Sequence, residues 1–486
     1  MKTKRTVSLL LCAAVILGLL SCAGETGKTA EKTSPDTFSA TDEEAGETTE
    51  YYKADVPVKD FDGHEFRFLT NDHNSLTWAY TTMDVESPDG EPINDAVYTR
   101  NRSTEETYNV KIVDIMQPFG GVNGAAMKSI KAGADDYDIV IEDVRHTANL
   151  ITERYVTDIT QIPHIDTQNP WWDSNVGGDL SVCGYTFFLG GDYTLAHYDT
   201  TCVLVFNKNL AVDNNIGDPY DFVLEGKWTL DEFDRMMKKV SKDLDGNGTF
   251  DENDLYGFTS LSFVFYPSFM TGAGALTVSK DSDDYPVYTL GSEHNTTVFE
   301  RLLSIMHQEN LVYDVIPLGK DHRLPEYMFA ADQALFWAQL IYWTTQLRDM
   351  KSDFGIIPFP KFDEKQTDYE VMMFGSPLSM VPVTNSDLER TGILLEYMAA
   401  YSRNELIPAY YDITMKEKVS RDETTKQILD IIFGNRCYTL AHAYFASIED
   451  GVTRLFEQNK NTFASYAEKS AKTAEKLIEK FVDSLQ

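Results

Sequence analysis

Cysteine and basic residues are scarce in this sequence. Only 5 of its 486 residues are cysteine, so a scaffold held together by disulfides is excluded. Lysine and arginine number 42 against 77 aspartate and glutamate, which leaves a net charge of −35. Because nucleic-acid binding depends on neutralising phosphates with basic side chains, this balance argues strongly against a nucleic-acid partner. A polybasic membrane-binding surface is disfavoured for the same reason.

Long hydrophobic runs are also lacking. The apolar run 7–20 falls short of the ~20 residues that a membrane-spanning helix needs, and it follows three basic residues, as an export signal does. It ends in LLSC at Cys22, which resembles the lipobox of bacterial lipoproteins. The resemblance implies that residues 1–21 are removed and that Cys22 carries the lipid. An ordinary secretory signal that happens to end beside a cysteine is the alternative.

The segment after this signal has little that could form a core. Residues 22–50 are rich in Thr, Glu, Gly, Ala and Ser and contain one aromatic residue, so we expect a disordered tether. Three cysteines remain beyond it, Cys183, Cys202 and Cys437, and at most one pair can form. They are expected to be small buried hydrophobic residues, with a bridge between Cys183 and Cys202 left open.

Short runs rich in β-branched and aromatic residues alternate with amphipathic stretches from Phe66 onward. Strands separated by helices predict a parallel sheet with α/β layering. A C-terminal amphipathic helix is expected over 464–485, because its apolar residues recur at three- and four-residue steps. The expected strands are 66–70, 110–115, 137–141, 187–191 and 202–208.

A calcium-type loop follows a helix that Thr229 can cap. Counting Asp243 as the first position, oxygen-bearing side chains fall at positions 1, 3, 5, 9 and 12, and Gly248 stands at the sharp turn. The loop is EF-hand-like rather than a full match, because position 12 is aspartate and a strand follows. We expect a structural Ca²⁺ site; an acidic turn without metal is the alternative. The expected ligands are Asp243, Asp245, Asn247, Thr249 through its carbonyl, Asp251 and Asp254.

Local patterns spread over the chain after Phe66 resemble extracellular solute-binding proteins of family 1, the sugar-binding components of ATP-driven importers. One departure is Asp332, which stands where such proteins usually have glycine; aspartate tolerates the left-handed turn required there. The patterns are GEPINDAVYTRN (90–101), NPWWDSN (169–175), FNKNL (206–210), KWTLDEF (227–233), FAADQALFW (329–337), FGIIPFPKFDEKQTDY (354–369) and RDETTKQILDIIF (421–433).

The resemblance implies an α/β, two-lobed, periplasmic-binding-protein-like (type II) fold with a hinge and an interlobe cleft. Lobe one is expected at 55–192 plus 329–375, and lobe two at 200–325 plus 385–486. The crossings would lie near 192–200, 324–328 and 374–382. A ligand that bridges both lobes would favour the closed state, and the importer would recognise that state.

A sugar presents apolar CH faces and a rim of hydroxyl groups. Its site therefore needs aromatic side chains for stacking and carboxylates for hydrogen bonds. Trp171 and Trp172 form an adjacent pair, of which we expect one in the core and one in the cleft. Each candidate could instead belong to the core or to a solvated loop. The candidates are Trp337, Trp172, Trp171, Trp78, Glu142, Asp143, Asp192, Tyr193, Tyr198 and Tyr266.

Two other functions are compatible with these residues. A surface glycoside hydrolase could pair Glu142 or Asp143 with Asp192 as acid and base. The same fold could instead bind a peptide, a polyamine or another small solute. The resemblance favours a non-enzymatic carbohydrate-binding protein, monomeric and lipid-anchored outside the bacterial cytoplasm, whose partners are ABC transporter permease subunits.

Overall fold

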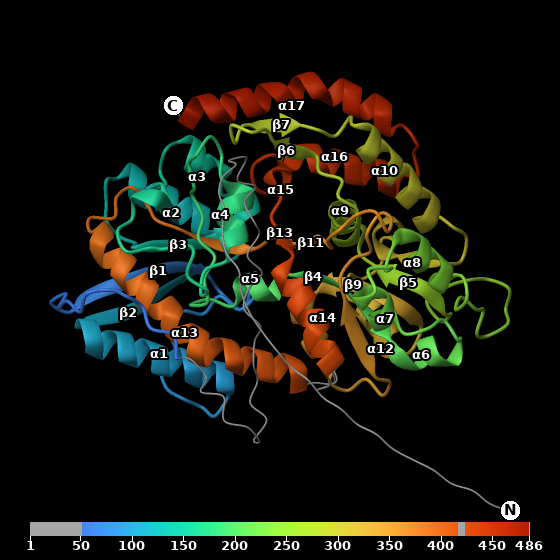
Figure 1. The fold of residues 1–486 in the computed structure, drawn as a ribbon, viewed down its shortest axis with the longest axis horizontal. Coiled ribbons are helices and arrows are strands. Elements are labelled where there is room, and N and C mark those ends of the chain that lie inside the picture. The colour runs from blue at the N-terminus through green and yellow to red at the C-terminus, as the bar shows by residue number, and fades with distance from the viewer. Residues whose placement is uncertain (1–50, 417–422, 486) are drawn as a thin grey trace, which may run out of the picture. The chain divides into compact units, whose positions relative to one another are not determined.

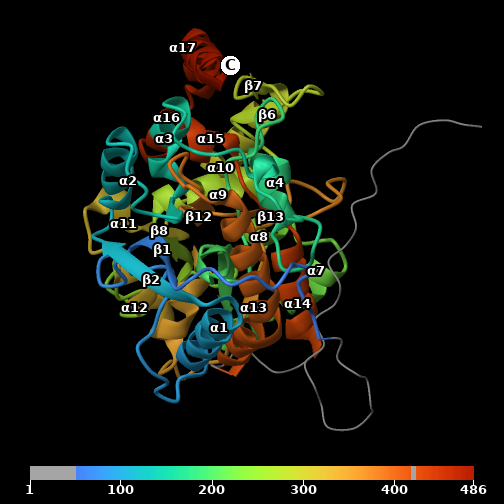
Figure 2. The ribbon, with the colours of Figure 1, turned by 90° about the vertical axis from the view of Figure 1, so that its left-hand side faces the viewer.

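The computed structural model describes residues 51–416 and 423–485. The expected signal segment 1–21, the tether 22–50 and the expected lipidation site Cys22 lie outside the described residues. Within those ranges the chain is mixed α/β, with two main β-sheets that are flanked by helices, as Figures 1 and 2 show. None of the helices in these ranges could serve as a membrane span.

The first sheet contains the N-terminal strands. Its central strand, β1, runs parallel to β2 from His64 beside Val110 to Asn71 beside Gln117, and also parallel to β3. β12 closes the other edge in the antiparallel direction. The strands, in spatial order, are β12 (Pro377–Met380), β3 (Ile139–Asp143), β1 (His64–Asn71) and β2 (Val110–Gln117).

Helices cover both faces of this sheet, and together they form lobe one. Phe66 and Phe68 of β1 are fully buried and join a core with Ile393 and Leu394 of the long helix α13, which packs along α1. The helices of the lobe are α1 (Pro92–Tyr108), α2 (Val122–Lys131), η1 (Val144–His146), α3 (Ala148–Thr152), η2 (Ile159–Gln161), α4 (Ser174–Leu180) and α13 (Leu388–Lys416).

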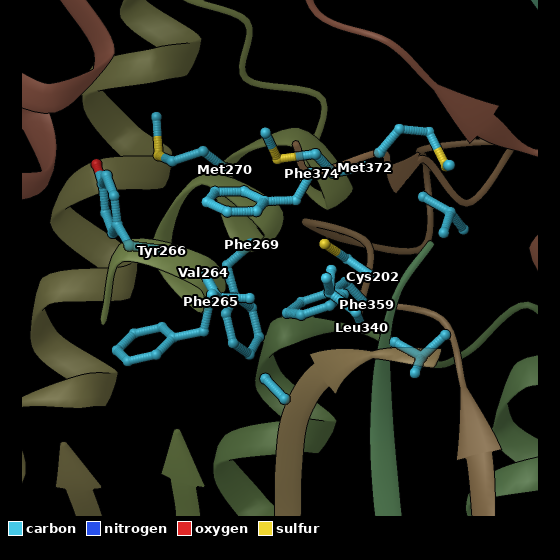
Figure 3. Packing of buried hydrophobic residues seen from close by; sticks show 14 of the residues in the cluster. Cys202, Val264, Phe265, Tyr266, Phe269, Met270, Leu340, Phe359, Met372 and Phe374 are labelled. Atoms are coloured by element: carbon cyan, nitrogen blue, oxygen red, sulfur yellow. The ribbon is translucent and has the colours of Figure 1, made fainter. Parts of the chain in front are cut away.

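The second sheet is the basis of lobe two. β4 runs antiparallel to both of its neighbours, whereas β5, β8 and β9 are parallel to one another. Phe258 of β5 packs ring against ring with Phe233 and Phe269, which belong to the helices before and after this strand. Figure 3 shows the side chains of α9 beside Cys202 and Leu340 of the sheet. The strands, in order, are β10 (Phe354–Ile357), β4 (Cys202–Asn207), β9 (Ala334–Leu340), β5 (Tyr256–Ser260) and β8 (Val312–Asp314).

The helices of lobe two come from the middle of the chain, together with one β-hairpin. As expected, Thr229 caps α8 by accepting a hydrogen bond from the backbone N–H of Glu232. The elements are α6 (Lys208–Asp213), α7 (Pro219–Leu224), α8 (Leu230–Met237), α9 (Ser262–Gly272), β6 (Val278–Lys280), β7 (Pro286–Tyr288), α10 (Glu293–Met306), α11 (Val315–Leu318), α12 (Leu324–Ala330) and η3 (Ile341–Leu347).

The C-terminal elements contact both lobes. α14 packs on β10, α15 on η1, and α16 on α9, whereas α17 contacts β7 and α10 of lobe two and α3 of lobe one. In Figure 1, α17 runs along the top of the view, above α3 of lobe one and α10 of lobe two. These elements are β11 (Val371–Met372), α14 (Glu423–Gly434), β13 (Arg436–Cys437), α15 (Leu440–Tyr444), α16 (Ala446–Glu457) and α17 (Phe463–Leu485).

Strand pairing divides the chain differently from the expected lobes. Residues 329–375 were expected in lobe one, yet β9 and β10 pair with β4 and β5 in the second sheet. α12 packs on β5 and β9, so 324–328 is no crossing. Residues 385–416 were expected in lobe two, yet α13 packs on α1. The physical reason is that hydrogen bonds between distant strands decide the lobe of a segment, and an apolar run is compatible with either sheet.

In the part of the chain that the structure describes, two neighbouring segments connect the two main sheets. Residues 191–201, with α5 (Ala196–Asp199), lead from the edge of the first sheet to β4, and residues 373–376 lead back to β12. Thr201 bridges to Met373, Phe374 N–H donates to the Thr200 carbonyl at 3.1 Å, and Val144 N–H donates to the Ser376 carbonyl at 3.1 Å. These two segments form the crossing region.

Candidate functional site

Three aromatic rings lie together at one edge of the first sheet. The carboxyl ends of β1, β2 and β3 meet there, and ligands of open α/β sheets bind at such edges. Trp78 follows β1, Phe119 follows β2, and His146 belongs to η1 after β3; all three are partly exposed. The ring centroids of Trp78 and Phe119 are 4.7 Å apart, and those of Phe119 and His146 are 5.2 Å apart.

Glu142 and Asp143 lie directly beneath these rings, at the end of β3, and both are fully buried. Glu142 accepts hydrogen bonds from Asn71 Nδ2 at 3.3 Å and from Asn123 N–H at 3.2 Å. It also lies 3.6 Å from His146 Nδ1, and this carboxylate raises the pKa of His146. Glu142 therefore positions the His146 ring and favours its protonated form.

Asp143 is paired with Arg145. Burial opposes the charge of Asp143, but the Arg145 guanidinium outweighs burial and holds the pKa of this carboxyl below its usual range. Arg145 in turn lies 4.9 Å from the centroid of the Phe374 ring, in a cation–π contact. The ion pair with Asp143 thus positions the Arg145 guanidinium, which extends from lobe one to Phe374 of the crossing region.

A second aromatic group lies at the corresponding edge of lobe two. Phe263, at the start of α9 just after β5, is 37% exposed. Its ring centroid is 5.8 Å from that of His322 and 6.3 Å from that of Phe374. The contacts from Arg145 through Phe374 and Phe263 to His322 connect the two lobes; we call these four residues the interlobe aromatic row.

Gly375, next to Phe374, allows this row to form. It has φ +62°, and a Cβ there would lie 2.8 Å from Arg145 Nη2 and 3.1 Å from Asp143 Oδ2. Its N–H donates to Nε2 of His442 at 3.0 Å. Only glycine fits both the backbone conformation and the space.

Tyr342 and Trp343 follow the carboxyl end of β9. Both are partly exposed, and their ring centroids are 5.7 Å apart. Sequence reasoning missed Phe119, His146, Phe263, Phe374 and this pair. The signal that could have identified Phe263 and Trp343 was their position directly after a strand, the same rule that selected Trp78.

Most of the predicted tryptophans lie in the core. Trp337, in the middle of β9, is 1% exposed and packs against Phe329. Trp171 and Trp172 are both buried, although one of them was expected in the cleft. The reason is Glu396 of α13, which accepts hydrogen bonds from the indole N–H of Trp171 at 3.0 Å and of Trp172 at 2.8 Å.

The predicted polar residues of the first crossing segment are also buried. Tyr198 OH donates to Asp192 Oδ1 at 2.9 Å, and Arg403 lies 3.4 Å from the other oxygen. Burial nevertheless raises the pKa of Asp192 to about 6. Tyr193 packs edge-on against Trp172. These three predicted residues are buried in and beside the first crossing segment, whereas Trp78 is partly exposed at the sheet edge.

Tyr266, on α9, is 2% exposed and packs against Phe456 with centroids 4.3 Å apart. It lines a cavity of about 10 Å³ together with Thr439 and Glu449. Among the described residues, Cys183 and Cys202 are free thiols, so the bridge left open between them is not formed.

The predicted metal loop brings carboxylates together. One oxygen each of Asp243, Asp245 and Asp254 lie within 4.8 Å of one another. The hydrogen bond from Gly248 N–H contributes most to lowering the pKa of Asp243, which also accepts one from Gly246 N–H. Clustered carboxylates with an amide and a carbonyl nearby are the ligands that Ca²⁺ takes, so the residues present fit the ion.

No protein-family model and no curated protein matches this chain. Solved structures do match. The maltose/maltodextrin-binding domain MalE from Bdellovibrio bacteriovorus bound to maltotriose covers 85% of this chain and 100% of its own, with 13% identity and a TM-score of 0.54. ABC substrate-binding protein Lmo0181 from Listeria monocytogenes, in complex with cycloalternan, covers 87% and 100%, with 14% identity and a TM-score of 0.54.

A cyclo/maltodextrin-binding protein complexed with maltotetraose covers 87% of this chain and 98% of its own, with 12% identity and a TM-score of 0.59. At such low identity the likeness concerns the arrangement of the backbone. The chain therefore has the two-lobed α/β fold of periplasmic binding proteins.

Proposed function

We propose that this protein captures a carbohydrate, most simply an oligosaccharide, for an ABC transporter, by lobe closure and without chemistry on the ligand. The observation that carries the proposal is the interlobe aromatic row, which runs from Arg145 of lobe one over Phe374 of the crossing region to Phe263 and His322 of lobe two. The similar structures are bound to maltotriose, cycloalternan and maltotetraose, and these ligands support a saccharide for this protein.

The exposed rings suit a saccharide by their chemistry. Trp78 and Phe119 on lobe one, and Phe263 and Trp343 on lobe two, offer apolar faces for the CH surface of a pyranose. His146 and His322 can exchange hydrogen bonds with ring hydroxyl groups. A ligand that contacts both sets of rings favours the closed state by its additional contacts, which is the requirement for a population shift.

The location that we propose is outside the cytoplasm, with the chain anchored to the cell membrane through lipid on Cys22 and delivering its ligand, as a monomer, to permease subunits. This rests on the sequence LLSC after an apolar run. Metabolic labelling with a radioactive fatty acid tests the anchor: label should enter the wild-type chain and not Cys22→Ala. Label in both variants, or in neither, would refute the assignment.

We further propose that the loop from Asp243 to Asp254 holds one structural Ca²⁺. Asp243, Asp245, Asn247, Asp251 and Asp254 would supply side-chain oxygens, and Thr249 its carbonyl. An ion there would join the end of α8 to the start of β5 and neutralise clustered acids.

Calorimetric titration of the purified protein with a panel of neutral oligosaccharides tests the main proposal, with chromatography of each mixture to detect cleavage. We expect saturable binding of at least one oligosaccharide, recovered intact. Cleaved product would establish the hydrolase alternative instead. Binding of peptides or polyamines only would keep the fold and remove the saccharide assignment.

A further inference from the structure

The turn of the β6–β7 hairpin in lobe two touches a turn of lobe one. Residues 281–284 form the hairpin turn, with Asp284 N–H donating to the Asp281 carbonyl at 3.2 Å. Residues 182–185 form the other turn, closed by two hydrogen bonds between Val182 and Tyr185. In Figures 1 and 2 the hairpin lies next to α17, which contacts β7.

Asp284 is the centre of this contact. Its carboxylate accepts hydrogen bonds from Ser181 Oγ at 2.9 Å and from Gly184 N–H at 3.0 Å, and its carbonyl accepts one from Cys183 N–H at 2.9 Å. Burial opposes its charge, but these donors and Lys280 lower its pKa, so the carboxylate is ionised.

Lys280 of β6 reinforces the contact from the same hairpin. Its Nζ donates to the Gly178 carbonyl at 2.7 Å and to Ser181 Oγ at 2.8 Å, and lies 2.9 Å from Asp284 Oδ1. The side chains of Lys280 and Asp284 are 19% and 26% exposed, so the pair is largely shielded from water. Partly buried ion pairs of this kind are screened less by salt than exposed ones.

The contact is separate from the crossing region. Within the described residues the chain passes between the two sheets at 191–201 and 373–376, whereas the two turns meet through side chains and backbone groups that no strand pairing requires. A relative displacement of ~1 Å takes these bonds beyond the ~3.5 Å at which they still count as hydrogen bonds. Any rotation of one lobe against the other must therefore break this contact or carry the hairpin with it.

We propose that Lys280 and Asp284 form an interlobe clasp that holds lobe one through residues 178–184 and restricts rotation of the lobes about the crossing region. The clasp stabilises the lobe arrangement seen in this structure against others. Its loss leaves the crossing region, the interlobe aromatic row and the contacts of the C-terminal elements with both lobes as restraints. The inference does not depend on which ligand the protein binds.

Pulsed electron paramagnetic resonance on the ligand-free protein tests the clasp. Nitroxides on noncanonical residues at Lys128 of α2 and Val212 of α6, both exposed, report the distance between the lobes. Asp284→Gly removes the carboxylate, and glycine accepts the positive φ of 60° at this position without strain. We expect a broader or shifted distance distribution than in the wild type.

Two further variants separate the clasp from general damage to the hairpin. Lys280→Met removes the cation while leaving Asp284 in place, and should broaden the distribution in the same sense. Asp283→Gly introduces the same flexible residue into the same turn at an exposed position, and should leave the distribution unchanged. Unchanged distributions in folded Asp284→Gly and Lys280→Met, or equal broadening in Asp283→Gly, would overturn the proposal. Because no ligand is present, this outcome is independent of the oligosaccharide titration.

Discussion

Replacement of Phe263 by alanine is the most direct test of the interlobe aromatic row. Phe263 remains 37% exposed, whereas an aromatic side chain buries roughly 200 Å² when fully covered. A ligand that stacks on it can therefore cover about 70 Å² more of its surface, which contributes ~2 kcal/mol at ~25 cal/mol per Å². At 25 °C this corresponds to a dissociation constant that is about 30-fold weaker.

Isothermal titration of the variant with the best-binding oligosaccharide measures this change. Phe263→Tyr keeps the ring and should retain most of the affinity. Tyr327→Ala removes another exposed aromatic residue of lobe two, 51% exposed on α12 and outside the row, and should leave the affinity unchanged. An unaltered dissociation constant in a folded Phe263→Ala variant would refute the assignment of this edge as the binding site.

Four further outcomes follow from the structure. Glu396→Ala leaves the two buried indole N–H groups of Trp171 and Trp172, and the partly buried amide of Asn169, without this acceptor. Each buried donor left without a partner costs ~1–3 kcal/mol, so urea denaturation should show a loss of about 2 kcal/mol or more, and a smaller loss would contradict the described hydrogen bonds. The pKa of His146 is raised, so its contribution to stability is complete below the unfolded value of ~6.5 and is lost as pH rises through the folded value. His146→Asn should abolish that pH-dependent component, and a retained component would assign it elsewhere. Burial raises the pKa of Asp199 to about 7, so stability should fall between pH ~4 and about 7, as the unfolded carboxyl loses its proton first; Asp199→Asn should flatten this slope, and an unchanged slope argues against the raised value. Removal of Ca²⁺ by a chelator should lower the Tm of the wild type while sparing ligand affinity, and should have no effect on Asp245→Ala; equal shifts in both would exclude the loop.

Local patterns in the sequence predicted local structure well. The strands expected at 66–70, 110–115 and 202–208 correspond to β1, β2 and β4, because hydrophobic runs with high strand propensity need no distant information. The α8 cap was likewise readable from neighbouring residues. The left-handed φ of 60° at Asp332 agrees with the turn that the family resemblance implied. The run 187–191 forms only isolated bridges, at Leu189 and Gly191.

Nonlocal partners limited the prediction of the site. Trp171 and Trp172 were separated in the prediction, because two adjacent indoles in a loop are difficult to bury together. Glu396, more than 220 residues away, accepts a hydrogen bond from each indole N–H and makes this possible. The lobe assignment of 329–375 differed for the same reason. Phe263 and Phe374 become neighbours only when the second sheet and the crossing region are assembled.

Gly375 affects both the flexibility of the crossing segment 373–376 and the position of Arg145. Because glycine has no Cβ, the backbone can adopt a positive φ where the chain returns to lobe one. The Arg145 guanidinium occupies the space that a Cβ would need. A larger residue introduced at position 375 to restrict the backbone would clash with the Arg145 guanidinium and displace it from its contact with the Phe374 ring. The flexibility of the chain at residue 375 and the position of the Arg145 guanidinium therefore both depend on the absence of a side chain there. A substitution of Gly375 should change both properties together.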